Sequence, residues 1–166
     1  MSPTHDPPLR AGLIGHPVAH SLSPVMQQAA FDALGLRARY DLWDTTHADL
    51  AARVAGLRAP GMLGANVTIP HKAAVVPLLD DLNITVRTLT GVVNTITRDA
   101  SGRLIGHNTD MPALLRVLDE HRTAPSGCHA LVLGAGGAAE AAVAGLWQRG
   151  CGLTLATRHA SRGVAL

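Results

Sequence analysis

The sequence predicts an α/β protein that begins with an open, mainly parallel sheet flanked by helices. Two observations support this fold class. Short apolar runs alternate with segments of helical periodicity, which is the pattern of repeated strand–helix units. The chain has 166 residues, of which 47% are hydrophobic and 16% are charged, so it has enough apolar residues for a buried core and too little charge for disorder.

The apolar runs and their flanking turn residues place the expected elements. Strands are expected in five segments of the first part of the chain, over residues 10–14, 38–43, 62–68, 92–97 and 103–106. The last two form a hairpin, because Asp99-Ala-Ser-Gly102 between them is a turn sequence. Helices are expected over 24–34 and 47–57, from Pro70, and from 108 to the polar linker at 121–127.

The sequence predicts the start of the first helix and the inward faces of the first two helices. Ser23 followed by Pro24 is typical of a helix start, since the hydroxyl can cap free amides and proline suits the first helical position. The residues of this helix that we expect to face inward are Val25, Ala29, Ala30 and Ala33. Those expected to face inward in the second helix are Leu50, Val54 and Leu57.

Composition and charge argue against several classes of protein. The net charge of +2 comes from scattered basic residues, and four aromatic side chains are few for stacking bases, so nucleic-acid binding is not expected. No apolar run reaches about 18 residues and no signal-type segment opens the chain, so we expect a cytoplasmic protein without a membrane span. Cys128 and Cys151 lack metal-ligand spacing and are expected to be thiols of a reducing compartment. The histidines, His71 among them, are expected to be ordinary loop residues, and no metal site is expected.

A glycine-rich turn follows the strand expected over 129–133. The sequence there is Gly134-Ala-Gly136-Gly-Ala-Ala139, and an alanine-rich helix follows to about residue 149. Gly134 permits a tight turn, Gly136 lets the backbone approach a pyrophosphate, and Ala139 is small enough for the helix to pack on the strand. The pattern predicts the first βαβ unit of a Rossmann-type nucleotide-binding domain. The alternative is a tight turn that contains small residues for packing alone.

The next strand indicates which cofactor this unit would bind. It is expected over 153–157 and ends at Thr157-Arg158, where no Asp or Glu is present to bind the ribose hydroxyl of NAD. An arginine at this place suits the 2′-phosphate of NADP, and Arg162 adds a second positive charge. We therefore expect NADP, although both arginines also suit a solvated surface.

Four polar clusters are expected at strand-to-helix turns. They are Ser21-Leu-Ser23, Asn66-Val-Thr68 with Lys72, Asn94-Thr95, and Asn108-Thr109-Asp110. In an open α/β sheet the carboxyl ends of the strands form the ligand crevice, so these clusters could surround a small polyol or carboxylate. A structural interpretation also exists, in which Ser23, Asn108 and Asp110 serve as helix caps. Lys72 has no such reason, because a cation early in a helix opposes the helix dipole, and it is therefore the candidate acid/base.

Five motifs of this sequence resemble shikimate dehydrogenases in their order and spacing. They are GHPVAHSLSP at 15–24, GANVTIPHK at 64–72, GVVNT at 91–95, GHNTD at 106–110 and GAGGA at 134–138. Together they span the chain from about residue 10 to its end. The resemblance implies an NADP-linked enzyme that interconverts 3-dehydroshikimate and shikimate in aromatic amino-acid biosynthesis.

The resemblance also implies roles for individual residues. Ser21 and Ser23 would bind the substrate carboxylate, and Thr68 and Asn94 would bind the ring side of shikimate. Asp110 would bind the ring as well, and Lys72, paired with Asp110, would exchange the proton. The residues implied to hold NADP are Gly134, Ala135, Gly136, Gly137, Ala138, Thr157, Arg158 and Arg162.

The chain departs from the family in places and in length. Thr157 and His159 replace the first and last residues of an Asn-Arg-Thr motif, Met111 replaces a usual glycine, and Thr85 replaces a usual carboxylate. Family members are longer, so we expect a fragment with a substrate-binding domain over 10–122 and a partial NADP-binding Rossmann domain over 128–166.

Three functions stay open on this basis. The first is the NADP-dependent shikimate dehydrogenase. The second is a quinate/shikimate dehydrogenase that uses NAD, and the third is a catalytically incomplete fragment that binds shikimate. In each, the partner is a small molecule rather than nucleic acid or membrane, and a homodimer is open as the assembly.

Overall fold

The computed structural model describes residues 7–123 and 127–158. Its first part is a six-stranded sheet in the order β2-β1-β3-β5-β6-β4. The strands are β1 (Leu9–Gly15), β2 (Ala38–Asp44), β3 (Met62–Val67), β4 (Asp81–Leu82), β5 (Thr95–Arg98) and β6 (Leu104–His107). β1 pairs in parallel with β2 and β3, and β4 with β6, whereas β5 is antiparallel to both of its neighbours. The predicted open, mainly parallel sheet is confirmed.

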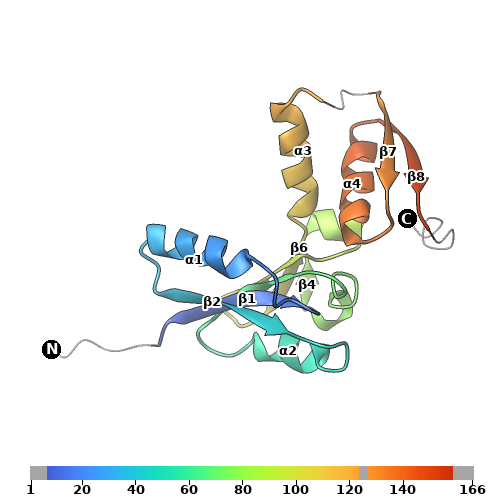
Figure 1. Cartoon of the computed structure of the whole chain (residues 1–166). Helices are drawn as coiled ribbons and strands as arrows, with labels where there is room; N and C mark the ends of the chain where they lie inside the picture. Colours follow the sequence, from blue (N-terminus) through green and yellow to red (C-terminus); the bar gives the residue numbers. More distant parts are fainter. Residues whose placement is uncertain (1–6, 124–126, 159–166) are drawn as a thin grey trace.

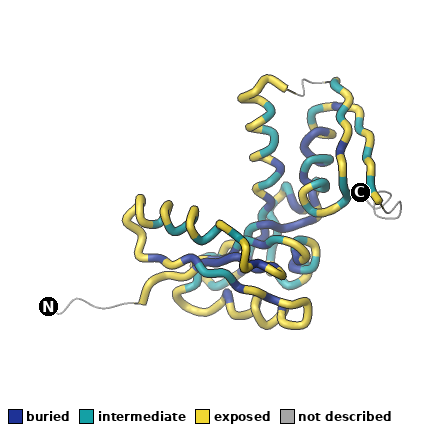
Figure 2. The backbone as a smooth tube through the Cα atoms, viewed as in Figure 1, coloured by how far each residue is buried: buried dark blue, intermediate teal, exposed yellow. Residues whose placement is uncertain are grey.

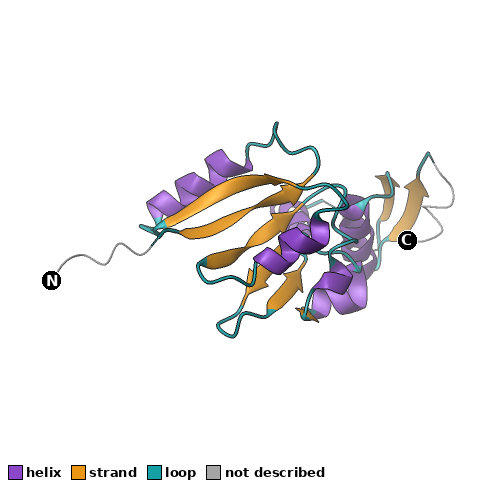
Figure 3. Ribbon diagram, turned by 90° about the horizontal axis from the view of Figure 1, so that it is seen from below, coloured by secondary structure: helices purple, strands orange, loops and turns teal. Residues whose placement is uncertain are grey.

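Helices cover both faces of this sheet (Figures 1 and 3). Helix α1 (Ser23–Ala33) lies on one face and helix α2 (Leu50–Gly56) on the other. On the α2 side the main core forms around Ile14, Leu57 and Leu104, each with 0% of its surface exposed. Burying one such side chain contributes roughly 1.5–3 kcal/mol, so this cluster supplies much of the stability of the sheet. Leu50, Val54 and Leu57 face this core, as predicted.

A second, two-stranded sheet follows (Figure 1). Helix α3 (Asp110–Glu120) leads from β6 to β7 (His129–Leu133), and helix α4 (Gly137–Gln148) joins β7 to its parallel neighbour β8 (Gly152–Ala156). Helices α3 and α4 pack together through Met111, Ala141 and Ala144. The predicted βαβ unit of a Rossmann-type fold is present. No helix in 7–123 or 127–158 combines the length and apolar character needed to cross a bilayer.

The predicted inward face of α1 is wrong. Val25 is 73% exposed, and Ala29, Ala30 and Ala33 are not buried against the sheet, so the face that we expected inside lies largely in solvent (Figure 2). Hydrogen bonds of Gln28 orient the helix instead. Gln28 Nε2 donates to the Ala38 carbonyl at 3.1 Å, and Gln28 Oε1 accepts from the Tyr40 amide at 3.2 Å. These bonds satisfy backbone groups of the edge strand β2, which favours a glutamine over an alanine on the inner face.

The predicted start of α1 at Ser23 and Pro24 is confirmed, but the predicted cap is wrong. Ser23 does not cap α1; its amide donates to Ser21 Oγ at 3.2 Å and its hydroxyl accepts from Ser21. The helix predicted from Pro70 is also wrong. No α-helix starts at Pro70; the chain makes turns and then one 3-10 turn, η1 (Val76–Leu78). Pro77 within that turn has no N–H to donate, so an α-helical ladder is interrupted there. Lys72 therefore lies in a turn, and the helix-dipole argument for it does not apply.

Smaller differences concern the hairpin region. The first hairpin strand begins at Thr95 rather than at 92, and the second helix begins at Leu50 rather than at 47. Strand β4 and a π-helical turn, η2 (Val86–Thr90), were not expected. Both are short elements without periodicity, so no pattern in the sequence predicts them.

Gly64 on β3 has a backbone conformation and surroundings that exclude a side chain. Its φ is +146°, and an added Cβ would lie 2.1 Å from the Ile96 carbonyl oxygen on β5. We expect Gly64→Ala to lower the free energy of unfolding by at least about 2 kcal/mol, through backbone strain and overpacking. Gly56→Ala is the control, since no described atom outside the adjoining residues and the backbone of α2 lies within 4 Å of its added Cβ. Urea unfolding should show a change within about 1 kcal/mol. Equal effects of the two substitutions would contradict the prediction.

Candidate active site

One edge of the six-stranded sheet gathers the polar residues. Lys72 follows the end of β3, and Asp110 follows the end of β6. Asn94 immediately precedes β5, and because β5 is antiparallel, its beginning lies at the same edge as the ends of its neighbours. Backbone bonds hold these segments together: the Val67 amide donates to the Asn94 carbonyl at 2.7 Å, and the Val93 amide donates to the Lys72 carbonyl at 2.9 Å.

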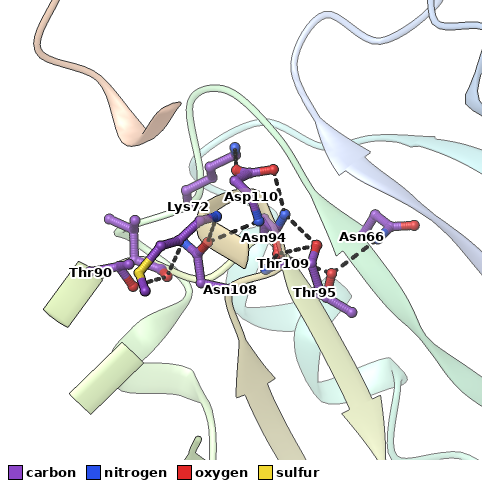
Figure 4. A network of polar contacts seen from close by, with 10 residues as sticks. Asn66, Lys72, Thr90, Asn94, Thr95, Asn108, Thr109 and Asp110 are labelled. Atoms are coloured by element: carbon purple, nitrogen blue, oxygen red, sulfur yellow. Dashed lines mark hydrogen bonds and ion pairs between the residues drawn. The ribbon is translucent and has the colours of Figure 1, made fainter. Parts of the chain in front are cut away.

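An ion pair lies at the centre of this edge (Figure 4). Lys72 Nζ is 2.5 Å from Asp110 Oδ2, and Asn94 Nδ2 donates to Asp110 Oδ1 at 2.7 Å. The Lys72 side chain is 16% exposed and that of Asp110 is 35% exposed, so the pair is sheltered but still reachable by a small molecule. Because both carboxylate oxygens accept charge-assisted or amide bonds, the carboxylate is held in one orientation.

The network extends from Asn94 across the strand ends. Asn94 Oδ1 accepts from the Thr109 amide at 2.9 Å and from the Thr95 hydroxyl at 3.1 Å. The Thr95 hydroxyl accepts in turn from Asn66 Nδ2 at 3.2 Å (Figure 4), and the Tyr40 hydroxyl donates to Asn66 Oδ1 at 2.7 Å. Burial raises the pKa of Tyr40 to about 12, so its hydroxyl keeps its proton. Tyr40 was not predicted as part of this network, because its sequence context indicates only an ordinary strand residue.

Asn108 has the structural role that the sequence left open. It is buried, and its Oδ1 accepts from the amides of Asp110 and Met111 at 3.0 and 3.1 Å, which satisfies the first turn of α3. Its Nδ2 donates to the Val92 carbonyl at 3.1 Å. Asn108 thus caps the helix, whereas Asp110 opens it with a side chain that is directed to Lys72.

Ser21, Ser23 and Thr68 line a separate pocket of about 590 Å³, together with His16 and His20. Ser21 Oγ donates to Ser23 Oγ at 3.0 Å, so the two hydroxyls lie side by side at the N-terminus of α1. Among the described residues, no carboxylate lines this pocket. The paired hydroxyls can therefore donate to an anionic ligand group. Lys72, Asn94 and Asp110 do not line this cavity. The six predicted substrate residues therefore form two groups at one sheet edge.

His71 connects the turn that carries Lys72 to the protein interior. Its side chain is completely buried, and its Nε2 donates to the Thr45 carbonyl at 2.7 Å. Its ring stacks on that of His47, with centroids 6.3 Å apart. His71 lies in a loop, as predicted, but its burial and its bond to the Thr45 carbonyl were not predicted. Its position next to Lys72 was the only available signal, because its partner lies 26 residues earlier in the chain.

The glycine-rich turn and the end of β8 form an open cradle. Its volume is about 580 Å³, and it is lined by Leu133, Gly134, Ala135, Gly136, Ala156, Thr157 and Arg158. Gly134 has a φ of +117°. Apart from its chain neighbours, no described atom lies within 4 Å of an added Cβ at Gly136, which leaves room for a pyrophosphate in front of the first turn of α4. The residues that could hold a dinucleotide phosphate group here are Arg158 and the glycine-rich turn before α4. Arg162 and His159 lie outside the described residues.

Gly137 and Ala138 do not line this cradle. An added Cβ at Gly137 would lie 2.8 Å from Lys72 Cδ, so the stem of Lys72 passes directly against the start of α4. The acid/base candidate consequently contacts both parts of the molecule: Asp110 through its ammonium group and the start of α4 through its methylenes.

Glu140, one turn further along α4, is a titratable residue that the sequence analysis did not single out. Its Oε2 is buried without a hydrogen-bond partner among the described residues. Burial raises the pKa of Glu140, and the positive charge of Lys72 opposes this effect only in part. It borders a cavity of about 660 Å³ between α4 and η2.

The raised pKa of Glu140 predicts a pH-dependent stability. The neutral form is favoured in the folded state, so this contribution is present below the unfolded pKa of 4.5 and is lost as pH rises through the folded pKa. We expect Glu140→Gln to stabilise the protein at pH 7 and to have little effect near pH 4. Urea unfolding at a series of pH values measures this, with the exposed Glu120→Gln as control. A difference that stays constant across that pH series would contradict it.

Comparisons with known proteins add three findings. The family model of the shikimate dehydrogenase substrate binding domain matches residues 13–96. A shikimate dehydrogenase (NADP(+)) from Geobacter metallireducens is 50% identical over 157 residues, covering 93% of this chain and 54% of that protein. The chain thus spans about half the length of the curated relatives that it matches.

Solved structures have the same fold. A shikimate 5-dehydrogenase from Thermus thermophilus in complex with NADP(H) and shikimate is 39% identical, with a TM-score of 0.84 over 95% of this chain and 59% of that one. A quinate dehydrogenase from Corynebacterium glutamicum in complex with NAD is 32% identical, with a TM-score of 0.85 over 95% of this chain and 58% of that one.

Proposed function

Because this chain belongs to the family of the shikimate dehydrogenase substrate-binding domain, we propose that it forms part of an NADP-dependent shikimate dehydrogenase. This part comprises a substrate-binding domain over 10–122 and the first portion of an NADP-binding domain over 128–166. The observation that carries the proposal is the Lys72–Asp110 pair at 2.5 Å, which lies at the sheet edge and is in contact with the start of α4.

The substrate is proposed to bind along the sheet edge. Ser21 and Ser23 present adjacent hydroxyls to the carboxylate of shikimate, and Thr68 lines the same pocket. Asn94 and Asp110 face the ring hydroxyls from the neighbouring strand ends. The hydrogen bonds within the network position these side chains before the substrate arrives, which lowers the entropic cost of binding.

Lys72 is proposed to move the proton. As alcohol is oxidised to ketone, neutral Lys72 Nζ takes the hydroxyl proton, and the carboxylate of Asp110 stabilises the ammonium that forms. In the reverse direction the ammonium returns that proton to the oxygen. NADP, when bound in the cradle with Arg158 near its 2′-phosphate, would supply or accept the hydride.

The alternative of a quinate/shikimate dehydrogenase that uses NAD has one observation in its favour, the likeness to the quinate dehydrogenase in complex with NAD. Arg158 in the cradle, and the absence of an acidic residue at Thr157, support NADP instead. We also propose that the protein is cytoplasmic and that its partner molecule is shikimate or 3-dehydroshikimate. No nucleic-acid partner is proposed, and a homodimer is open as the assembly.

Calorimetric titration with shikimate tests the substrate pocket. We expect saturable binding, and Ser21→Ala should weaken it by about 1.5–3 kcal/mol if the hydroxyl contacts a carboxylate. Ser101→Ala is the matched control, because Ser101 lies exposed in the β5–β6 turn, where its amide and hydroxyl donate to Asp99. Equal affinities of the two variants would exclude Ser21 from the pocket, and tighter binding of quinate than of shikimate would favour the alternative.

Turnover with shikimate and NADP⁺ tests the role of Lys72. Lys72→Ala should lower turnover by about 10²–10⁴-fold, because that is the usual contribution of a general acid/base, and should change the affinity for shikimate much less. Lys72→Arg keeps the charge but cannot release its proton, so it should not restore turnover. Restoration by arginine would show a purely ionic role. Shikimate binding without any turnover of the unmodified chain would support the third hypothesis, a fragment that binds but does not catalyse.

A further inference from the structure

The two cysteines of the chain lie side by side at one end of the second sheet. Cys128 immediately precedes β7, and Cys151 immediately precedes β8. The parallel register begins with His129 opposite Gly152, and the Gly152 amide donates to the Cys128 carbonyl at 2.7 Å. Neighbouring strands are about 4.7–4.9 Å apart, which lies within the Cα separation of about 4.4–6.8 Å that a disulfide requires.

The sulfur atoms already point toward each other. Cys128 Sγ donates to Cys151 Sγ, and the two atoms are 2.9 Å apart. Cys151 is 5% exposed, whereas Cys128 is only half-buried, so Cys128 is the more accessible of the two. The pair lies away from the substrate edge, and the proposed reaction does not use it.

We propose that Cys128 and Cys151 are a redox-modification site, at which a small-molecule disulfide such as oxidised glutathione converts the two thiols into a reversible intrachain disulfide. The inference does not rest on the proposed function. It requires only the placement of two thiols by the β7–β8 register.

The chemistry balances in two exchange steps. The thiolate of Cys128 attacks one sulfur of the reagent, forming a mixed disulfide and releasing one reagent thiolate. The thiolate of Cys151 then attacks Cys128 Sγ and releases the second reagent thiolate. The two cysteine protons end on the two released thiols, so the protein loses two electrons and two protons and one reagent disulfide is reduced.

Proximity rather than acidity favours this bond. The hydrogen bond that Cys128 donates to Cys151 raises the pKa of the Cys128 thiol, and the nearby Arg149 guanidinium opposes this only in part. The first exchange is therefore slow at neutral pH, but the second is fast because its two sulfurs are adjacent. An equilibrium measurement after long incubation is consequently the right readout.

The bond should stabilise the βαβ unit without changing the cradle. It would join residues 23 positions apart and so restrict the unfolded chain around α4. The cysteines lie at the N-terminal ends of β7 and β8, whereas Gly134 and Arg158 follow the C-terminal ends of these strands. Oxidation should thus raise the urea midpoint of unfolding and leave shikimate affinity unchanged.

Mass spectrometry after incubation with oxidised glutathione tests the site. The folded chain should lose both alkylatable thiols, gain no glutathione, and yield one linked peptide pair containing Cys128 and Cys151. Cys151→Ser should instead keep a stable glutathione adduct on Cys128, since no second thiol can resolve it. The chain holds only these two cysteines, so no other intrachain disulfide can form.

The unmodified chain in concentrated urea is the control for the fold. There the two thiols are no longer held together, so glutathione adducts should replace most of the intrachain bond. The inference is overturned if the folded chain keeps both thiols or accumulates glutathione adducts without an intrachain bond. It is also overturned if urea leaves the yield of the intrachain bond unchanged.

Discussion

The partly buried ion pair of Lys72 and Asp110 constrains the architecture around it. Withdrawing two charges from water is costly unless their remaining hydrogen-bonding capacity is met. Asn94 Nδ2 donates a hydrogen bond to Asp110, and Asn94 Oδ1 accepts from the Thr109 amide and the Thr95 hydroxyl. The ends of β3 and β6 and the start of β5 must therefore stay in register. The antiparallel β5 is what brings Asn94 to the edge where its parallel neighbours end.

Much of the fold could be predicted because its elements are locally encoded. Apart from β4, the strands of the six-stranded sheet lie in apolar runs between turn residues, and Leu50, Val54 and Leu57 repeat at helical spacing and are buried. The orientation of α1 could not be predicted in this way. It depends on the Gln28 side chain, which bonds backbone groups of β2 some ten residues away. A hydrophobicity pattern contains no information about such side-chain hydrogen bonds, so it predicted that the alanines of α1 face inward.

The site was predictable to a similar degree and for a similar reason. Lys72 and Asp110 follow the carboxyl ends of strands, and the rule about such ends places them together. Asn94 precedes β5 and joins them because β5 is antiparallel to both neighbours. Glu140 and Tyr40 were missed, and the burial of His71 was not foreseen, because their partners and surroundings come only from tertiary packing. The Thr45 carbonyl is 26 residues from His71, and the Asn66 amide is 26 residues from Tyr40. The positional clue for Lys72 was itself unsound, since no α-helix is present there, although the residue does join the network.

The length of the Lys72 side chain matters because its stem lies against Gly137. Cβ and Cδ of Lys72 lie against the place where a side chain at 137 would be, while Nζ extends to Asp110. The stem is therefore a spacer that sets how near the turn after β3 can come to the beginning of α4, and the tip is an electrostatic contact. A shorter cation would have to give up one of these two tasks. Any side chain at 137 would have to displace the Lys72 stem, so the glycine of this turn leaves the room in which the lysine extends to Asp110.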